Sequence, residues 1–373
     1  MTDKPAGRPA RPFFSSGPCA KPPGWSPDKL KIDSLGRSHR SKLGKARLAY
    51  CIDLMREALE LPETHRIGIV PASDTGAYEM AMWTMLGARP VTALAWESFG
   101  EGWVTDAVKQ LKLDPKVIRA GYGELPDLSQ VDWSSDVLFT WNGTTSGVRV
   151  PDGEWIAADR QGLSFADATS AVFAYDLPWD KIDVATFSWQ KVLGGEGAHG
   201  VLILGPRAVE RLESYTPVWP LPKVFRLTSK GKLSEGIFKG ETINTPSMLA
   251  VEDAIFALEW AKGLGGLQGL IARSDANAAA LDRIVEEREW LSHLAADPGF
   301  RSRTSVCLTL EGADEARVKK VAALLEAEDV AYDIAGYRDA PPGLRIWCGA
   351  TVDTADIEAL GPWFDWAWTE SAS

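Results

Sequence analysis

The stretch VATFSWQKVLGG, residues 184–195, leads from an apolar segment into a lysine and two glycines. Its first five residues are typical of a strand that is buried on both faces of a parallel sheet. Lys191 follows closely, and Gly194 and Gly195 would let a ligand approach the backbone. Ligands of parallel α/β sheets lie beyond the carboxyl ends of the strands. The position suits a reactive lysine, although, taken alone, a solvated loop lysine explains it more simply.

Similar apolar segments of strand length alternate with helical periodicity along the first two hundred residues. A helix is expected at 43–61, where Pro62 ends the apolar spacing. The expected strands are 66–70, 91–96, 137–141, 163–167, 184–188 and 200–204. Strands that are apolar throughout and separated by helices predict an α/β protein with a mostly parallel sheet covered on both faces.

A second unit is expected towards the C-terminus. Residues 206–246, rich in Pro, Lys and Gly, predict an extended excursion, and 247–287 have helical spacing. Beyond residue 303 a new alternation begins. Its expected elements are strands at 304–310, 330–334 and 344–348, a helix at 313–328 and a closing helix from Asp353. The predicted organisation is a flexible lead-in (1–15), a large domain (16–262) and a small C-terminal α/β domain (263–373).

Composition limits the possible partners and the compartment. The chain has 373 residues and a formal net charge of −11, which argues against nucleic acid and anionic lipid as partners. No apolar run approaches transmembrane length, and residues 1–12 lack the apolar core of a signal peptide. The cysteines are scattered without metal-ligand spacing, so no metal is expected and a reducing cytoplasm fits; they are Cys19, Cys51, Cys307 and Cys348.

Asp167 closes the strand that comes one βα unit before Lys191. A buried carboxylate there can pair with the pyridinium nitrogen of pyridoxal phosphate and keep the ring protonated as an electron sink. A helix N-cap is the alternative for this aspartate. The combination of an Asp strand end and a Lys strand end favours the cofactor, with Lys191 as its imine-forming amine.

Two further strand ends and one helix start suit the same ligand. Residues 71–77 (PASDTGA) carry small and hydroxyl residues into a helix, where backbone N–H groups bind anions, although ordinary capping explains Ser73 or Asp74 equally well. In 141–147 (WNGTTSG), Thr144 could donate to the phenolic oxygen of the cofactor. Trp103, at a loop-to-helix junction, could stack on its ring, although most of the sixteen tryptophans are expected in the core.

Basic residues suggest an anionic substrate in this acidic chain. Residues 37–42 (RSHRSK) include His39 and Arg40 and would provide counter-charge for a phosphate, or simply form a solvated basic segment. Arg345 leads into an apolar strand, an unusual place for an arginine unless it binds an anion such as a substrate carboxylate.

Six segments of the chain occur in the order found in phosphoserine aminotransferases, which are class V pyridoxal-phosphate enzymes of fold type I. The segments are 14–18 (FSSGP), 38–42 (SHRSK), 142–144 (NGT), 190–191 (QK), 244–246 (NTP) and 343–345 (GLR). The resemblance covers nearly the whole chain and is nearest to a divergent bacterial and archaeal branch. It implies a seven-stranded sheet in the large domain, a smaller C-terminal domain, and amino transfer between glutamate and 3-phosphohydroxypyruvate in serine biosynthesis.

The resemblance also implies roles for individual residues. Lys191 resembles the Schiff-base lysine and Asp167 the partner of the pyridine nitrogen. The other cofactor-binding positions that match are Asp74, Thr75, Trp103, Thr144, Gln190, Asn244 and Thr245. Asn244 and Thr245 match residues that reach the cofactor of the neighbouring subunit, which implies a homodimer with shared active sites. The substrate-binding positions that match are Ser16, His39, Arg40, Arg338 and Arg345.

The chain departs from the better-known branch at two places. Asp74-Thr75 replace a glycine-arginine pair at the phosphate turn, and Tyr337 replaces a histidine before Arg338. The substrate pocket therefore has one potential cation fewer, which would lower affinity for a phosphorylated substrate or widen the substrate range.

Alternatives from three classes stay open. They are a class V transaminase acting on serine, alanine or glyoxylate, a lyase such as a cysteine desulfurase, and a binding protein without catalysis. The basic segment argues against the first, the strand position of Cys348 against the second, and the presence of both Lys191 and Asp167 against the third.

Overall fold

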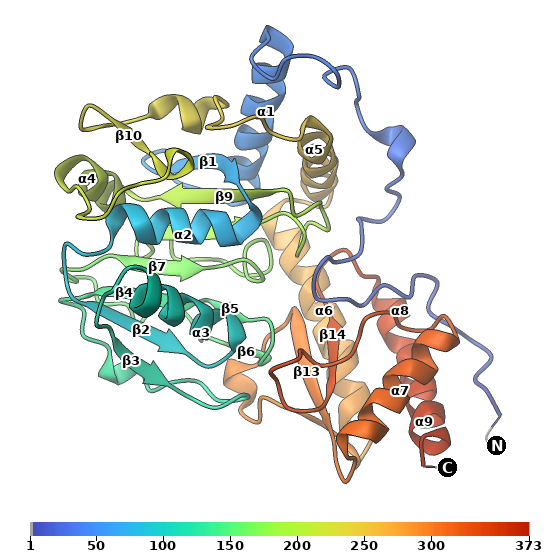
Figure 1. Cartoon of the computed structure of the whole chain (residues 1–373). Coiled ribbons are helices and arrows are strands. Elements are labelled where there is room, and N and C mark those ends of the chain that lie inside the picture. Colours follow the sequence, from blue (N-terminus) through green and yellow to red (C-terminus); the bar gives the residue numbers. More distant parts are fainter. Residues whose placement is uncertain (1–2, 373) are drawn as a thin grey trace.

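A seven-stranded sheet runs through the larger unit of the molecule in the computed structural model, which describes residues 3–372 (Figure 1). The strand order is β1-β9-β8-β7-β4-β2-β3, and β9 alone is antiparallel to its neighbours. The strands are β1 (Arg66–Pro71), β2 (Val91–Ala95), β3 (Lys116–Arg119), β4 (Asp136–Thr140), β7 (Ser164–Asp167), β8 (Val184–Ser188) and β9 (His199–Leu204). The predicted mostly parallel α/β sheet is confirmed.

Helices cover both faces of this sheet. Successive side chains of a strand point to opposite faces, so an apolar strand has apolar side chains to bury on each face. In β9, Val201 and Ile203 join the core on one face, and Leu202 and Leu204 join the core on the other. The first face packs against α1 (Lys42–Ala58) and α5 (Met248–Gly263). The second packs against α2 (Ser73–Met85), α3 (Ser98–Thr105) and α4 (Pro206–Ser214).

Two parts of the larger unit differ from the prediction. Strand β3 was not predicted: it is an edge strand in which only Ile118 is fully buried, so it lacks an apolar run. The predicted excursion at 206–246 is wrong at its start, where residues 206–214 form α4. Pro206 is the first residue of this helix. Proline is favoured there because the first N–H groups of a helix have no partner within it. The rest of that segment contains η4 (Lys223–Phe225), β10 (Thr228–Ser229), β11 (Lys232–Leu233) and η5 (Glu235–Lys239).

The C-terminal unit combines a sheet with helices, as the predicted small α/β domain does. Its antiparallel sheet has the order β12 (Leu291–His293), β13 (Ser305–Leu310) and β14 (Leu344–Trp347). Its helices are α6 (Leu267–Glu286), α7 (Glu315–Ala327), α8 (Thr354–Glu358) and α9 (Leu360–Glu370). The short strand β12 was missed. The predicted strand at 330–334 is wrong: Asp333 has φ +56°, and only isolated bridges form at Tyr332 and Ala335.

Short elements complete the fold. They are η1 (Pro27–Lys29), a π-helical turn η2 (Asp106–Gln110), η3 (Leu128–Gln130), the two-residue strands β5 (Asn142–Gly143) and β6 (Val148–Arg149), and η6 (Pro298–Phe300).

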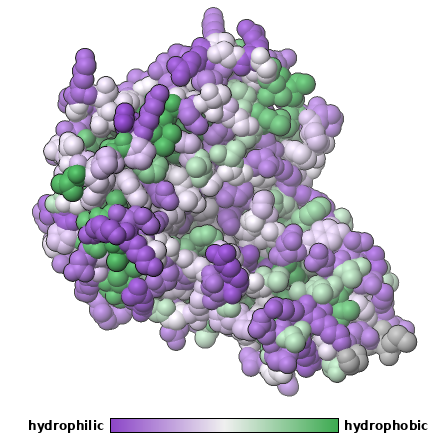
Figure 2. Space-filling view, in the orientation of Figure 1, coloured by the Kyte–Doolittle hydropathy of each residue, from purple (hydrophilic) through white to green (hydrophobic). Residues whose placement is uncertain are grey.

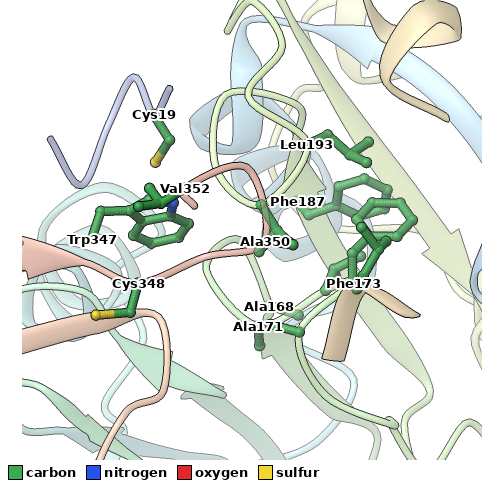
Figure 3. Close-up of a cluster of buried hydrophobic side chains, with 14 of the residues drawn as sticks. Cys19, Ala168, Ala171, Phe173, Phe187, Leu193, Trp347, Cys348, Ala350 and Val352 are labelled. Atoms are coloured by element: carbon green, nitrogen blue, oxygen red, sulfur yellow. The ribbon is translucent and has the colours of Figure 1, made fainter. Parts of the chain in front are cut away.

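One apolar core extends from the sheet into the C-terminal unit. It contains Phe173 and Phe187 of the larger unit together with Trp347, the last residue of β14, and Ala350 beyond it, all nearly or fully buried. Figure 3 shows side chains from both units in this cluster. The two units therefore share buried surface and are not connected by α6 alone.

The N-terminal segment lies along the C-terminal unit, and both ends of the chain are on that side (Figure 1). The carbonyl of Gly7 accepts a hydrogen bond from Trp363 Nε1 at 2.6 Å, and the Ala10 amide donates to Asp356 Oδ1 at 2.6 Å. Further along, the Trp347 amide donates to the Phe14 carbonyl at 3.0 Å. This route brings Ser16 and Gly17 to the edge of the sheet where Lys191 lies.

Within residues 3–372, no helix is both long and apolar enough to cross a membrane. Hydrophilic side chains cover most of the face shown in Figure 2, with smaller hydrophobic areas between them.

Candidate active site

Lys191 follows β8 and is buried at the carboxyl end of the sheet. Its Nζ donates a hydrogen bond to the carbonyl oxygen of Ser16. Burial lowers the pKa of Lys191, and the positive charge of Arg345 adds to this effect. Lowering this pKa favours the neutral amine, which is the form that attacks an aldehyde.

Asp167 ends β7, the strand next to β8, where it is paired in register with Thr186. Both of its carboxylate oxygens accept hydrogen bonds. Trp103 Nε1 donates to Oδ2 at 3.1 Å, and the Thr169 amide donates to Oδ1 at 3.1 Å. These two N–H donors fix the orientation of the buried Asp167 side chain.

Lys191 and Asp167 share a cavity of about 350 Å³. Its wall comes from several strand ends and from the first turns of α2 and α3. The lining residues are Gly17, Pro18, Ser73, Asp74, Thr75, Phe99, Trp103, Thr140, Thr144, Asp167, Thr169, Gln190, Lys191 and Gly197. The structure thus brings together the predicted cofactor residues except Asn244 and Thr245.

The turn between β1 and α2 forms one wall of this cavity. Ala72 and Ser73 have φ +70° and +55°, a left-handed conformation that is uncommon for residues with side chains and concentrates at functional sites. Gly76 is required here, because a Cβ at this position would contact the Pro71 carbonyl oxygen. The turn presents the N-terminus of a 13-residue helix to the cavity, which is a favourable place for a phosphate.

Several buried oxygens of the cavity wall have no hydrogen-bond partner within residues 3–372. They are Asp74 Oδ1, Thr140 Oγ1, Thr169 Oγ1 and Gln190 Oε1. Buried polar atoms normally have partners, so a polar ligand is expected in this space. An amine-bearing lysine, a carboxylate and a helix N-terminus around one cavity fit pyridoxal phosphate.

Thr144 lies in the hairpin formed by β5 and β6, at the cavity wall. Its Oγ1 donates to Ser170 Oγ at 2.9 Å, and its carbonyl accepts from Ser305 Oγ at 2.6 Å. The Ser305 and Ser16 hydroxyl oxygens are also within hydrogen-bond distance of each other, at 3.1 Å. These bonds link the hairpin, the C-terminal unit and the N-terminal segment beside Lys191.

Seven of the predicted site residues do not line this cavity; they are Ser16, Arg338 and Arg345, and the four residues His39, Arg40, Asn244 and Thr245. His39 and Arg40 line a second cavity of about 290 Å³ together with Lys45 and Glu241. Asn244 and Thr245 are exposed on the segment that follows. A single chain therefore does not bring these four side chains to Lys191.

The two predicted arginines of the C-terminal unit flank one aromatic ring. The guanidinium carbons of Arg338 and Arg345 each lie 5.6 Å from the centre of the Tyr337 ring. Arg338 is exposed and pairs with Asp339, whereas Arg345 is half-buried. In the described part of the chain, Arg345 Nε has no hydrogen-bond partner.

Sequence reasoning missed Glu97 and Phe99, which follow β2. Glu97 Oε1 accepts from the Gly100 amide at 2.8 Å and caps α3, and Oε2 accepts from Thr145 Oγ1 at 2.7 Å. Burial raises the pKa of Glu97 to about 7. Phe99 lines the cavity and contacts the Tyr337 ring at 5.7 Å. Both residues follow a predicted strand end, and this position is the sequence signal that could have found them.

The cysteines are all free and buried. Burial raises the pKa of Cys348 far above its ordinary value, and it raises the pKa of Cys19 to about 12. Neither thiol is therefore a thiolate of the kind that a cysteine desulfurase needs. Among residues 3–372, no group of three or more His, Cys, Asp or Glu is placed to hold a metal ion.

The sheet and the Lys191–Asp167 cavity define a pyridoxal-phosphate enzyme of fold type I. No family model matches the chain. It is 58% identical over 366 residues to "Phosphoserine aminotransferase" of Methanosarcina barkeri, with 98% of this chain and 99% of the relative covered. The chain belongs to the phosphoserine aminotransferase family, for which pyridoxal phosphate is the expected cofactor.

Solved structures agree on the fold. A phosphoserine aminotransferase from Cytophaga hutchinsonii superposes with a TM-score of 0.83 at 21% identity, covering 95% of this chain and 98% of that one. A ureidoglycine-glyoxylate aminotransferase from Bacillus subtilis reaches 0.82 at 14% identity, covering 99% and 96%. Since enzymes named for different substrates share this fold, the fold alone does not define the substrate.

Proposed function

We propose that this protein transfers an amino group between glutamate and 3-phosphohydroxypyruvate, giving O-phospho-L-serine and 2-oxoglutarate. The observation that carries the proposal is the placement of Lys191 and Asp167 at adjacent strand ends around one cavity. Support comes from the 58% identity to a relative named phosphoserine aminotransferase. The activity would belong to serine biosynthesis.

Lys191 and Asp167 have the catalytic roles in this proposal. When bound, pyridoxal phosphate supplies an electron sink for the electrons left at the substrate α-carbon. The Lys191 amine would act as general base to take the proton from that carbon and then as general acid to return it on the other side of the substrate nitrogen. Asp167 would keep the pyridine nitrogen protonated, and its own orientation is fixed by Trp103 and Thr169.

The remaining cavity residues would bind and orient the cofactor. Trp103 would cover the ring, and Thr144 would donate to the phenolic oxygen. Asp74, Thr75 and Gln190 lie where the phosphate would meet the N-terminus of α2, with Gln190 Oε1 lacking a partner among the described residues.

The substrate-binding residues form two sets, one for the carboxylate of the substrate and one for its phosphate. Arg345 would bind the α-carboxylate: its charge acts on Lys191, and its Nε has no partner in residues 3–372. Ser16 would contact the substrate from the N-terminal segment. His39, Arg40 and Arg338 would bind the substrate phosphate. They supply the phosphate counter-charge that an otherwise acidic chain requires.

The proposal includes a homodimer with shared active sites, and it is supported by the position of His39, Arg40, Asn244 and Thr245 away from Lys191 in the same chain. The segment before α1, α1 itself and α5 also expose large apolar side chains. They include Ile32 (59% exposed), Leu35, Tyr50 on α1 and Leu249 on α5 (50% exposed). A second copy would cover these side chains and add its own His39 and Arg40 to the neighbouring cavity. Sedimentation should give a dimer mass.

The three-part division at residues 15 and 262 and a cytoplasmic location are also proposals. Four unpaired, buried thiols are consistent with a reducing compartment. Phosphorylated oxo acids other than 3-phosphohydroxypyruvate, including one from pyridoxine synthesis, are further candidate acceptors.

The test compares steady-state rates with glutamate and a series of oxo acids, phosphorylated and unphosphorylated. We expect kcat/KM to be highest for a phosphorylated acid. The Lys191→Ala variant should have no turnover, and the exposed Lys232→Ala should match the parent enzyme. A preference for alanine, serine or glyoxylate would replace the proposal with another class V transamination. A spectrum that does not change on adding glutamate would indicate a binding protein.

A further inference from the structure

Asp74 is a buried carboxyl group that the proposed chemistry does not use directly. It lies in the first turn of α2, only 7% exposed, and lines the cavity with Asp167. Its Oδ1 has no hydrogen-bond partner among residues 3–372. A buried carboxylate oxygen without a partner costs free energy, whereas a protonated carboxyl group can donate to a neighbour.

The neighbours of Asp74 do not supply a counter-charge. The groups that act on it are Asp167 at the end of β7, Thr169 just beyond β7, and Thr186 on β8. Hydrogen bonding by the two threonine hydroxyls lowers the pKa of Asp74, but burial and the negative charge of Asp167 raise it more strongly. No cationic side chain of residues 3–372 is among the groups that act on Asp74.

Titratable groups on the surrounding elements do not supply a counter-charge for Asp74 either. The pKa of Tyr78 on α2 is raised by burial, so its phenol is neutral. Burial lowers the pKa of His199 on β9 to about 4, so its imidazole is neutral as well. Lys191, after β8, donates to the Ser16 carbonyl, and Glu97, before α3, is bound to Gly100 and Thr145.

Asp167 is better placed than Asp74 to hold a negative charge. It accepts from Trp103 and from the Thr169 amide, whereas Asp74 Oδ1 accepts from none of the described residues. Two adjacent buried carboxyl groups cannot both ionise cheaply, and the proton stays on the less stabilised one. Burial and the Asp167 charge raise the pKa of Asp74 well above its ordinary value.

We propose that Asp74 and Asp167 share one proton at neutral pH, with Asp74 as the protonated member and hydrogen-bond donor. The pair then presents one negative charge to the pyridine nitrogen and none at the N-terminus of α2. An ionised Asp74 would repel the cofactor phosphate at that N-terminus, and a protonated one does not. The benefit to phosphate binding rests on the proposed function, whereas the shared proton is a property of the chain alone.

The test uses the cofactor-free protein and the Asp74→Asn variant, which keeps the shape and a donor but cannot ionise. For an acid whose pKa is raised by folding, stability is present below the unfolded pKa and is lost as pH rises through the folded pKa. Wild-type protein should therefore lose unfolding free energy relative to Asp74→Asn between pH 4 and pH 8. Denaturant unfolding at several pH values measures this difference.

Asp127→Asn is the matched control, because side-chain bonds from Ser129 and Gln130 lower the pKa of this exposed aspartate. Its pH-dependent difference has the opposite sign and is confined to pH values below about 4, so Asp127→Asn and wild type should give parallel curves between pH 4 and pH 8. Parallel curves for wild type and Asp74→Asn would overturn the shared proton. A wild-type protein that shows the expected curve but does not bind pyridoxal phosphate would contradict the proposed function and leave the shared proton supported.

A second measurement tests the consequence for the cofactor. Fluorescence titration with pyridoxal phosphate at pH 7 should give Asp74→Asn a Kd within a few-fold of wild type, since the neutral amide mimics the protonated acid. If wild-type Asp74 is ionised, removing its charge should instead tighten binding at least tenfold, and that result would contradict the proposal.

Discussion

Trp103 Nε1 donates a hydrogen bond to Asp167 Oδ2 over 3.1 Å, joining α3 to the end of β7. The same indole packs against Tyr78 with ring centres 4.4 Å apart. Trp103 therefore orients the carboxylate as well as presenting an aromatic surface to the cavity. The sequence suggested only the second role.

Replacing Trp103 with phenylalanine separates these two roles. Trp103→Phe keeps an aromatic ring but removes a hydrogen bond to a charged group, which contributes roughly 1.5–3 kcal/mol. We expect the affinity for pyridoxal phosphate to fall about tenfold or more. Absorbance titration measures this change, and Trp290→Phe, in the Trp290–Trp368 stack of the C-terminal unit, is the control. An unchanged Kd would show that the bond does not orient Asp167.

Arg40 should act in the active site of the other subunit. Arg40→Ala removes a charge-assisted contact, so KM for the phosphorylated oxo acid should rise roughly tenfold or more, and KM for glutamate much less. Mixed dimers of Arg40→Ala and Lys191→Ala subunits should recover activity, because one of the two sites is then intact.

The neighbouring Lys42→Ala variant serves as a control for loss of positive charge from the same segment. Equal effects of Arg40→Ala on both substrates would contradict a phosphate-binding role. Failure of the mixed dimers to regain activity would contradict shared sites.

Tyr337 should hold both arginines of the C-terminal unit. Tyr337→Phe keeps the ring and should change KM little, whereas Tyr337→Ala removes two cation–π contacts of about 0.5–1 kcal/mol each and should raise KM several-fold for both substrates. Tyr337→His adds a potential cation and should lower KM for the phosphorylated acid only. Steady-state kinetics below pH 7 would reveal this lower KM. If all three variants changed KM equally, the Tyr337 ring would not be what positions the two arginines.

Glu97 should make stability depend on pH near neutrality. Its pKa is raised from 4.5 to about 7, so stability is lost as pH rises through 7. At about 1.4 kcal/mol per pH unit, Glu97→Gln should gain roughly 3 kcal/mol over wild type between pH 4.5 and pH 7.5. Unfolding curves at both pH values test this. A pH-independent difference would contradict a buried acid at this position.

The sequence predicted the central part of the molecule well for a physical reason. Buried parallel strands such as 184–188 are continuous apolar runs, and the residues at their ends are forced to one edge of the sheet. Lys191, Asp167, Asp74 and Thr144 could therefore be placed near each other without coordinates. The prediction that they bind the cofactor is still to be tested.

Other features depend on packing that no local pattern reveals. Edge strand β3 is half exposed, and Asp333 breaks a run that reads as a strand. The contact of Asp74 with Asp167 joins residues almost a hundred positions apart, so its raised pKa follows only from the fold. The separation of His39 and Arg40 from Lys191 likewise appears only in three dimensions.

The apolar core that joins Phe173 and Phe187 to Trp347 and Ala350 has a consequence for heat denaturation. Segments that share buried surface melt as one cooperative unit, because neither can open without exposing the other. We expect a single calorimetric peak for the whole chain, rather than separate peaks for the sheet and the C-terminal unit. Two resolved peaks would show that this contact is too weak to couple them.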